Sequence, residues 1–163
     1  MITRRAICAG AAASFLAACD SKFKTYNGPE VTRIQVFKGQ RVMQLLHNDS
    51  LLASYTFELG FAPDGHKAFY GDGRTPEGAY RINRRNPNSR YHLSLGISYP
   101  NANDIAYARS LGRSPGGDIF IHGTPKLFSG QDDWTYGCIA VTDDEMEDIY
   151  AMVKDGTPIF IYP

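Results

Sequence analysis

Short segments of alternating apolar and polar residues dominate the first half of the chain. They are rich in Val, Ile, Leu, Tyr and Phe, and clusters of Gly, Asn, Asp and Pro separate them. They cover residues 31–37, 41–46, 51–58 and 78–82. Alternation with a period of two predicts strands. The glycine between the first two segments and the polar connection between the second and third predict antiparallel hairpins.

Two segments have helical signals instead. Residues 103–111 begin with Asn103 and are followed by a glycine, and residues 142–154 begin with Thr142 as the expected N-cap. Glu145 completes a capping box in the second segment. The acidic residues of its first turn suit the positive end of the helix dipole, so we expect them on a solvated face. The sequence therefore predicts a mainly β fold with one or two short helices.

The N-terminus has the pattern of an export signal. Arg4 and Arg5 precede an apolar run over residues 6–18 that holds no acidic residue and is too short to cross about 30 Å of hydrocarbon as a helix. The run ends in the letters LAAC at Cys19, which resemble the lipobox of bacterial lipoproteins, where the cysteine carries the lipid. Cleavage without lipidation is the alternative.

These signals divide the chain into three parts. We predict a signal peptide over residues 1–18, a lipid-attached tether over 19–30 and one domain over 31–163. Removal of the first part leaves 15 basic residues against 17 acidic ones, and this balance does not suggest nucleic-acid binding. The remaining length suits one hydrophobic core. We expect an exported, periplasmic protein that the lipid holds at a membrane.

Cys138 is the one thiol expected in the mature domain. Cys8 leaves with the signal peptide, and Cys19 is the predicted lipidation site. A single thiol cannot form an intramolecular disulfide, and in an oxidising compartment its presence suggests a chemical use. The alternative is a buried cysteine that serves as a small apolar side chain.

The candidate chemistry lies in the last third of the chain. Residues 118–121 are typical of a buried strand that ends at His122 and Gly123, while Cys138 follows Gly137 and precedes another apolar segment. A histidine within hydrogen-bond reach activates a thiol by taking its proton. The glycine lets a substrate approach and leaves the backbone N–H groups of Gly137 and Cys138 as candidates for binding an oxyanion.

The chain has three other histidines, His47, His66 and His92. His47 falls in a predicted turn, so His122 is the better partner for the thiol. A zinc site that joins Cys138 to the remaining histidines is an alternative, but no paired ligand spacing of the usual kind supports it. We therefore predict no metal and no cofactor.

These segments resemble the YkuD-type L,D-transpeptidase catalytic domain. That family carries a His-Gly strand end and, after a loop, a Ser/Thr-His-Gly-Cys segment, which here correspond to residues 122–123 and 135–138. The upstream segment GDGRTPEGAY, residues 71–80, is similar to the family's Thr-Pro-x-Gly-x-Phe/Tyr turn. The resemblance covers roughly residues 31–162. It implies a YkuD-like β-sandwich of mixed sheets.

The same resemblance implies a cysteine acyltransferase of cell-wall biogenesis. Cys138 would attack the carbonyl on the L-centre of diaminopimelate in a peptidoglycan stem tetrapeptide, release D-alanine and pass the acyl group to an amine. His122 would act as base and then as acid, oriented by the backbone carbonyl of Gly123. Carboxypeptidase or amidase chemistry on the same fold, and a non-catalytic cell-wall-binding lipoprotein, are the alternatives. A papain-like peptidase would place its cysteine early, at a helix start.

The sequence departs from the family pattern beside the nucleophile. Tyr136 stands where most members have a second histidine, and Ala140 stands where many have Asn or Arg. We expect Tyr136 and Thr135 to contact the substrate. Substrate carboxylates need cations, and a solvated loop is the alternative for the basic segment 81–90. Its candidate cations are Arg84, Arg85 and Arg90.

Overall fold

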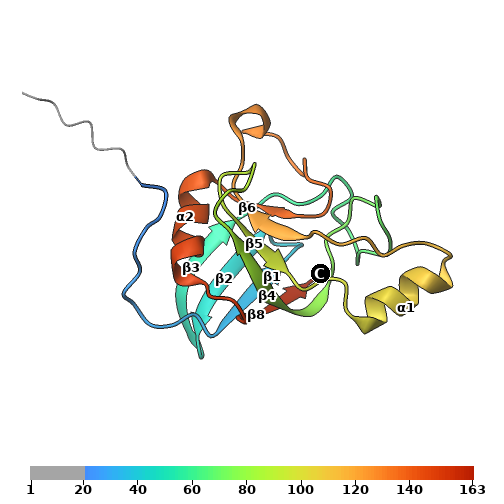
Figure 1. Cartoon of the computed structure of the whole chain (residues 1–163), viewed down its shortest axis with the longest axis horizontal. Helices are drawn as coiled ribbons and strands as arrows, with labels where there is room; N and C mark the ends of the chain where they lie inside the picture. Colours follow the sequence, from blue (N-terminus) through green and yellow to red (C-terminus); the bar gives the residue numbers. More distant parts are fainter. Residues whose placement is uncertain (1–20) are drawn as a thin grey trace, which may run out of the picture.

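The structure, a computed structural model, describes residues 21–163 (Figure 1). The predictions for the signal peptide, Cys8 and Cys19 lie outside these residues. The described elements are β1 (Arg33–Phe37), β2 (Val42–His47), β3 (Ser50–Thr56), β4 (Gly78–Asn86), β5 (Ser94–Ile97), α1 (Ala102–Ser110), β6 (Phe120–His122), the 3-10 helix η1 (Lys126–Phe128), β7 (Ile139–Ala140), α2 (Asp143–Met152) and β8 (Pro158–Tyr162).

The strands form one curled, mixed sheet in the order β3-β2-β1-β8-β4-β5-β6-β7. The pairs β1·β8 and β6·β7 are parallel and the others are antiparallel. The chain after β3 meets β7, because Glu58 and Ala140 exchange backbone hydrogen bonds of 2.8 and 2.9 Å. The two ends of the sheet thus approach each other around the core (Figure 1). The predicted mainly β fold with mixed strand pairing is confirmed.

The core follows from the period-two pattern. Ile34 and Val36 of β1 are fully buried, as are Met43 and Leu45 of β2, while their neighbours are more exposed. All four belong to one apolar cluster that includes residues of β4 to β8 and of α2. Each such side chain contributes roughly 1.5–3 kcal/mol when it is removed from water. The predicted hairpin β1–β2 pairs Phe37 with Val42 across its turn.

Both predicted helices form, with one correction. Helix α2 begins after Thr142, which makes the predicted capping box with Glu145. Helix α1 begins earlier than expected, because Asn101 is its N-cap and forms a capping box with Asp104. The Asn101 side chain accepts hydrogen bonds from two backbone N–H groups, so the N-cap lies two residues before Asn103 and the helix begins at Ala102.

Strand β4 corrects the interpretation of the basic segment. Residues 81–90 were candidates for a solvated loop, but β4 continues to Asn86 and pairs with β8 and then with β5. The patterns in the sequence predict no strand at β5 or β8. Strand β8 occupies the centre of the sheet between β1 and β4, so a strand from the end of the chain completes the core.

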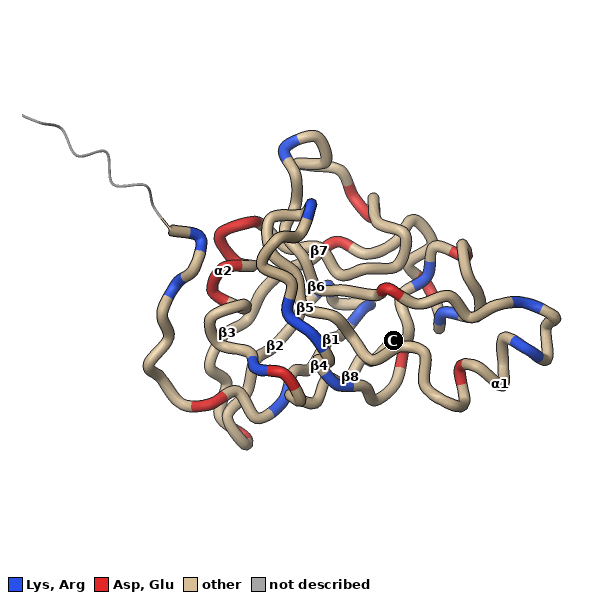
Figure 2. The backbone as a smooth tube through the Cα atoms, viewed as in Figure 1, with Lys and Arg blue, Asp and Glu red and all other residues tan. Residues whose placement is uncertain are grey.

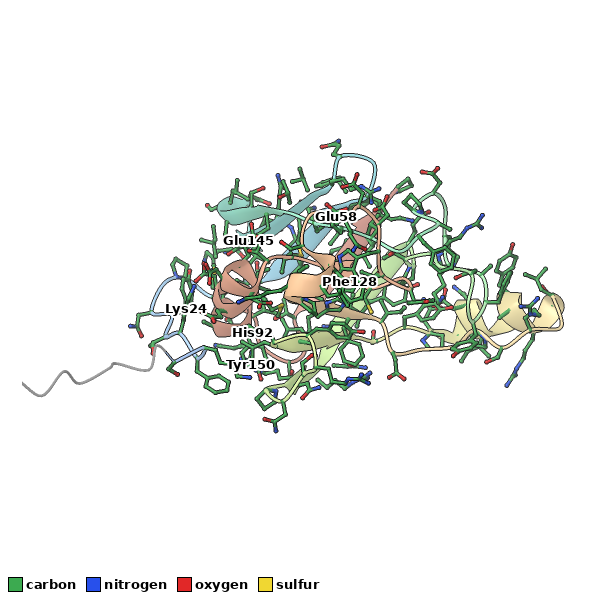
Figure 3. The ribbon with its side chains drawn as sticks, turned by 90° about the horizontal axis from the view of Figure 1, so that it is seen from above. Lys24, Glu58, His92, Phe128, Glu145 and Tyr150 are labelled. Carbon is green, nitrogen blue, oxygen red and sulfur yellow. The ribbon has the colours of Figure 1, made fainter. Side chains whose placement is uncertain are left out.

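The segment before β1 lies along α2. Lys24 Nζ lies 2.8 Å from Asp148 Oδ1 and donates to the carbonyl of Asp144 at 3.1 Å. Figure 2 shows the acidic residues of α2 near basic residues of this segment, and Figure 3 labels Lys24 beside the helix. The first described residues are therefore attached to the domain. Within residues 21–163, no helix has the length and apolar character needed to cross a membrane.

Candidate active site

His122 ends strand β6, and Cys138 directly precedes the neighbouring parallel strand β7. Strands β6 and β7 pair Ile121 with Ile139, and both of these side chains are fully buried. Side chains alternate between the two faces of a strand, so His122 and Cys138 lie on the face opposite to the two isoleucines. There both line a pocket of about 830 Å³, which we call the His122 pocket.

The imidazole of His122 is oriented by a backbone carbonyl. Its Nδ1 lies 2.7 Å from the oxygen of Gly123. A carbonyl oxygen only accepts, so Nδ1 carries the proton and Nε2 is the basic atom. Burial lowers the pKa of His122, and the hydrogen bond to Gly123 opposes this effect only in part. The imidazole is therefore neutral at neutral pH.

Three aromatic side chains that the sequence analysis did not single out fix the position of this imidazole. The Tyr91 ring stacks on it with centroids 4.5 Å apart, and Trp134 meets it edge-on at 5.5 Å. Phe128 stacks on Trp134 at 4.2 Å. Trp134 is the only tryptophan of the chain and lies four residues before Cys138, which was the available signal. No signal in the sequence pointed to Tyr91 or Phe128.

Cys138 is half-buried. Its Sγ donates to the carbonyl of Asp118 at 3.6 Å, and within residues 21–163 the thiol makes no hydrogen bond to a histidine. Burial raises the pKa of the Cys138 thiol to about 11, against opposing effects from the backbone of Phe120 and the charge of Lys67. Catalytic hydrogen bonds often tighten only when substrate binds.

The turn that carries Cys138 joins the two motif segments. Thr135 Oγ1 donates to the carbonyl of Cys138 at 2.8 Å and accepts from the N–H of Gly137 at 3.1 Å. Thr75 Oγ1, from the upstream segment, donates to the carbonyl of Gly137 at 2.9 Å. Gly137 has a φ of 116°, and a Cβ there would come within 2.4 Å of the Arg74 carbonyl oxygen. Only glycine suits this position.

This turn distinguishes the two N–H groups expected to bind an oxyanion. The N–H of Gly137 already donates to Thr135. The N–H of Cys138 has no hydrogen-bond partner in the part of the chain that the structure describes. The group on Cys138 is therefore the available one, and Gly137 would serve only if its bond to Thr135 broke.

The predicted substrate-binding residues separate into two groups. Thr135, Tyr136 and Arg90 line the His122 pocket. Arg84 lies at its edge, where it pairs with Asp118 at 2.8 Å and covers the Phe120 ring. Arg85 is not among the residues that line this pocket. Its guanidinium donates to the carbonyls of Tyr150 and Val153 at the end of α2.

The other histidines bind elsewhere. His66 accepts from the N–H of Glu77 at 2.9 Å and faces Asp104 at 3.2 Å. His92 lies near α2 (Figure 3) and pairs with Glu147 at 2.8 Å. Among residues 21–163, no three potential ligands come together to hold a metal ion. The structure thus gives no support to a zinc site that joins these histidines to Cys138.

Known proteins are similar to this chain in sequence and in fold. Residues 31–161 match the family model of YkuD, the L,D-transpeptidase catalytic domain. YafK of Escherichia coli strain K12 is 32% identical over 136 residues, which cover 80% of this chain and 50% of YafK. The chain therefore spans about half the length of the curated relatives it matches.

Solved structures of known proteins have a similar fold. A variant of the helical cell shape determining protein Pgp2 from Campylobacter jejuni has 25% identity and a TM-score of 0.64, with 83% of this chain and 48% of that chain covered. An L,D-transpeptidase from Mycobacterium smegmatis has 13% identity and a TM-score of 0.55, with 82% and 59% covered, and so shares the fold alone. The match over residues 31–161 shows that the chain belongs to the YkuD family of L,D-transpeptidase catalytic domains.

Proposed function

We propose that this protein is a peptidoglycan L,D-transpeptidase that works through a thioester on Cys138. One observation carries the proposal: His122 at the end of β6 and Cys138 just before the parallel strand β7 line one pocket, and the bond to Gly123 leaves Nε2 of His122 as the basic atom. A base and a thiol that line the same pocket are the groups that nucleophilic acyl transfer needs. Membership of the family supplies the substrate class.

The reaction takes place in two balanced steps. Nε2 of His122 takes the proton of Cys138, and the sulfur attacks the carbonyl between the L-centre of diaminopimelate and D-alanine. The oxyanion accepts from the N–H of Cys138. The carbon–nitrogen bond then breaks as His122 returns the proton to the departing amine. An amine of a second stem attacks the thioester and gives its proton to His122, the carbon–sulfur bond breaks, and His122 returns the proton to the sulfur so that the thiol forms again.

The pKa directions of the Cys138 thiol and the His122 imidazole indicate how the thiol proton is transferred in the first step. Burial raises the pKa of the thiol and lowers that of the imidazole, so a thiolate–imidazolium pair is not the resting state. We infer that His122 removes the proton while the sulfur attacks, as a general base. A bound peptide that excludes water and bridges the two groups would make this transfer possible.

Purified domain incubated with disaccharide tetrapeptides, followed by mass spectrometry, tests the proposal. Transpeptidation gives a dimer that lacks one D-alanine, whereas a carboxypeptidase gives a monomer that lacks it. An amidase on the same fold would instead cleave an existing cross-link. Cys138→Ser, which keeps the size of the side chain, should give none of these products. Unchanged masses with the wild type would favour the non-catalytic cell-wall-binding lipoprotein.

We also propose that the domain is exported and that Cys19 attaches it to a membrane by a lipid. The lipobox-like letters before Cys19 support this proposal, since covalent acyl chains provide such anchoring. Metabolic labelling with a fatty-acid analogue tests it. Cys19→Ala should lose the label and release or mislocalise the protein, and equal labelling of both proteins would contradict the anchor.

A further inference from the structure

Cys138 lies between two pockets. Besides the His122 pocket, it lines a second pocket of about 770 Å³, which we call the Lys67 pocket. Tyr136 and Asp118 also line both. The Lys67 pocket is walled by Tyr70 and by glycine backbone, and His122 is not part of it. A substrate bound at the sulfur therefore has space on both sides of its reacting carbonyl.

Lys67 provides a buried cation in the second pocket. Its side chain is 3% exposed, and Nζ donates to Asp72 Oδ1 at 2.7 Å and to the Phe69 carbonyl at 3.2 Å. An ammonium group has three N–H donors, so one is left without a partner among residues 21–163. Removing a charge from water is costly unless partners compensate it. A ligand oxygen in the pocket would satisfy the third donor.

Asp72 holds this lysine without consuming its remaining donor. The carboxylate also accepts from the backbone N–H groups of Ala68, Phe69 and Arg74 at 2.7, 3.1 and 3.1 Å. Burial would raise the pKa of Asp72, but the bonds from Lys67 and the backbone lower it overall. Asp72 therefore stays ionised, and the charge of Lys67 is fixed in place.

The charge of Lys67 acts at the reaction centre. It favours the thiolate of Cys138 against the effect of burial on the thiol pKa. Asp118 is the other charged residue that lines the Lys67 pocket. The charge of Asp118 raises the pKa of the thiol, but its carboxylate is mostly exposed and pairs with Arg84 at 2.8 Å, so solvent and a guanidinium weaken this effect. The buried ammonium group of Lys67 is therefore the group in this pocket that can bind an anion.

We propose that Lys67 binds the carboxylate of the amino acid that leaves, so that the Lys67 pocket selects a free C-terminal α-carboxylate. This inference rests on the proposed function. In the scissile bond, the D-alanine carboxylate is attached to the carbon next to the departing nitrogen. With the acyl part in the His122 pocket, the leaving residue lies across the sulfur from it, beside Lys67. Lysine provides a compact point charge for such a group.

Paired substrates test this role. A tetrapeptide with a free C-terminal carboxylate and the same peptide as a C-terminal carboxamide should differ at least tenfold in kcat/KM with the wild type. Lys67→Met should bring the ratio near one, and Lys67→Arg should keep part of it. Lys38→Met is the matched control, because Lys38 is also 3% exposed and pairs with Glu77 at 2.8 Å, but lines a pocket without Cys138. Equal losses on both peptides with Lys67→Met would overturn the proposal.

A second measurement does not depend on turnover. Iodoacetate carries a carboxylate and iodoacetamide does not, and both alkylate the thiolate. Both reagents react with the same thiolate, so the ratio of their rates at one pH does not depend on the thiol pKa. Lys67→Met should lower the iodoacetate to iodoacetamide ratio several-fold, while Lys38→Met should leave it unchanged. If muropeptides stay unmodified but this ratio falls, the proposed function fails and the anion site stands. An unchanged ratio would overturn the anion site.

Discussion

The imidazole of His122 is held by its own neighbour, because Nδ1 lies 2.7 Å from the carbonyl oxygen of Gly123. This carbonyl takes the place that a carboxylate has in a conventional triad. It accepts a hydrogen bond at every pH but carries no negative charge to stabilise an imidazolium. Together with burial, which lowers the pKa of His122, the arrangement favours a neutral base.

Gly123→Ala should disturb this arrangement. A Cβ at this position would come within 2.3 Å of Asp143 Oδ1 and 3.0 Å of the Tyr91 carbonyl oxygen, so the backbone that orients His122 must shift. We expect kcat/KM to fall at least tenfold, measured on muropeptides, because small displacements of a catalytic group cost about that much. Gly39→Ala is the control, since its nearest non-neighbouring atom lies 3.8 Å away. Full activity of Gly123→Ala would mean that the carbonyl does not position the ring.

Thr135→Val should separate the role of the turn from general stability. The change removes the hydroxyl that donates to the Cys138 carbonyl and accepts from Gly137. We expect a loss of about 1–3 kcal/mol in the free energy of unfolding, and a loss of activity that is larger than stability explains. Urea unfolding and muropeptide turnover measure the two effects.

A matched control exists for this change. Thr32 also donates to a carbonyl, that of Leu46, and accepts from a backbone N–H, that of Asn48. It lies at the β1–β2 hairpin, away from Cys138. Thr32→Val should cost similar stability and keep the kcat of the folded protein. If both variants lose the same activity, Thr135 supports the fold and not the nucleophile.

Tyr136→Phe tests the residue that replaces the usual histidine. The Tyr136 side chain is 78% exposed and meets the Phe61 ring edge-on at 5.5 Å. A phenol with a pKa of about 10 is a poor base near neutral pH. We expect Tyr136→Phe to lose far less activity than His122→Ala, measured as kcat/KM at pH 7. Similar losses would show that the hydroxyl takes part in proton transfer.

The proposed nucleophile and base could be named from the sequence because their signals are local. A glycine before Cys138, and a strand that ends at His122, mark the chemistry within a few residues. Lys67 had no such signal, since a lysine in a polar segment resembles any solvated charge. Its burial depends on Asp72 and on the fold of the surrounding loop. The contacts of Arg85 had no such signal either, because its carbonyl partners lie at the end of a helix far away in the sequence.

The fold shows the same division between local and distant causes. The β1–β2 and β2–β3 hairpins, and the capping box of α2, follow from neighbouring residues and were predicted. Strand β8 pairs with β1 and β4, which precede it by roughly 120 and 80 residues. Its five residues are too short an apolar run to be distinguished by pattern from a loop or a helix end. Such pairing is set by the closure of the whole sheet.

The ionisation of the Cys138 thiol, and with it the rate of its alkylation, should depend on pH in a way that reflects its burial. Burial raises the pKa of Cys138 to about 11, above the value of about 8.5 for a free cysteine. The neutral thiol is thus favoured in the folded state. The contribution of the neutral thiol to the free energy of unfolding is complete below the pKa of Cys138 in the unfolded chain. It is lost as the pH rises toward the higher pKa of Cys138 in the folded protein. Below the pKa of the thiol, the thiolate fraction rises about tenfold per pH unit. The rate of alkylation by iodoacetamide should therefore still rise about tenfold per pH unit near pH 10.

The same profile tests whether His122 forms an ion pair with the thiolate in the free protein. Such a pair would give a plateau of alkylation near neutral pH, as in cysteine enzymes with strongly lowered thiol pKa values. Because burial lowers the pKa of His122, we expect no plateau, and His122→Ala should leave the alkylation profile unchanged while it abolishes turnover. Activity should rise with pH through the lowered pKa of His122, as the imidazole loses its proton. A plateau that disappears in His122→Ala would show that the ion pair exists before substrate binds, and the general-base step would then be wrong.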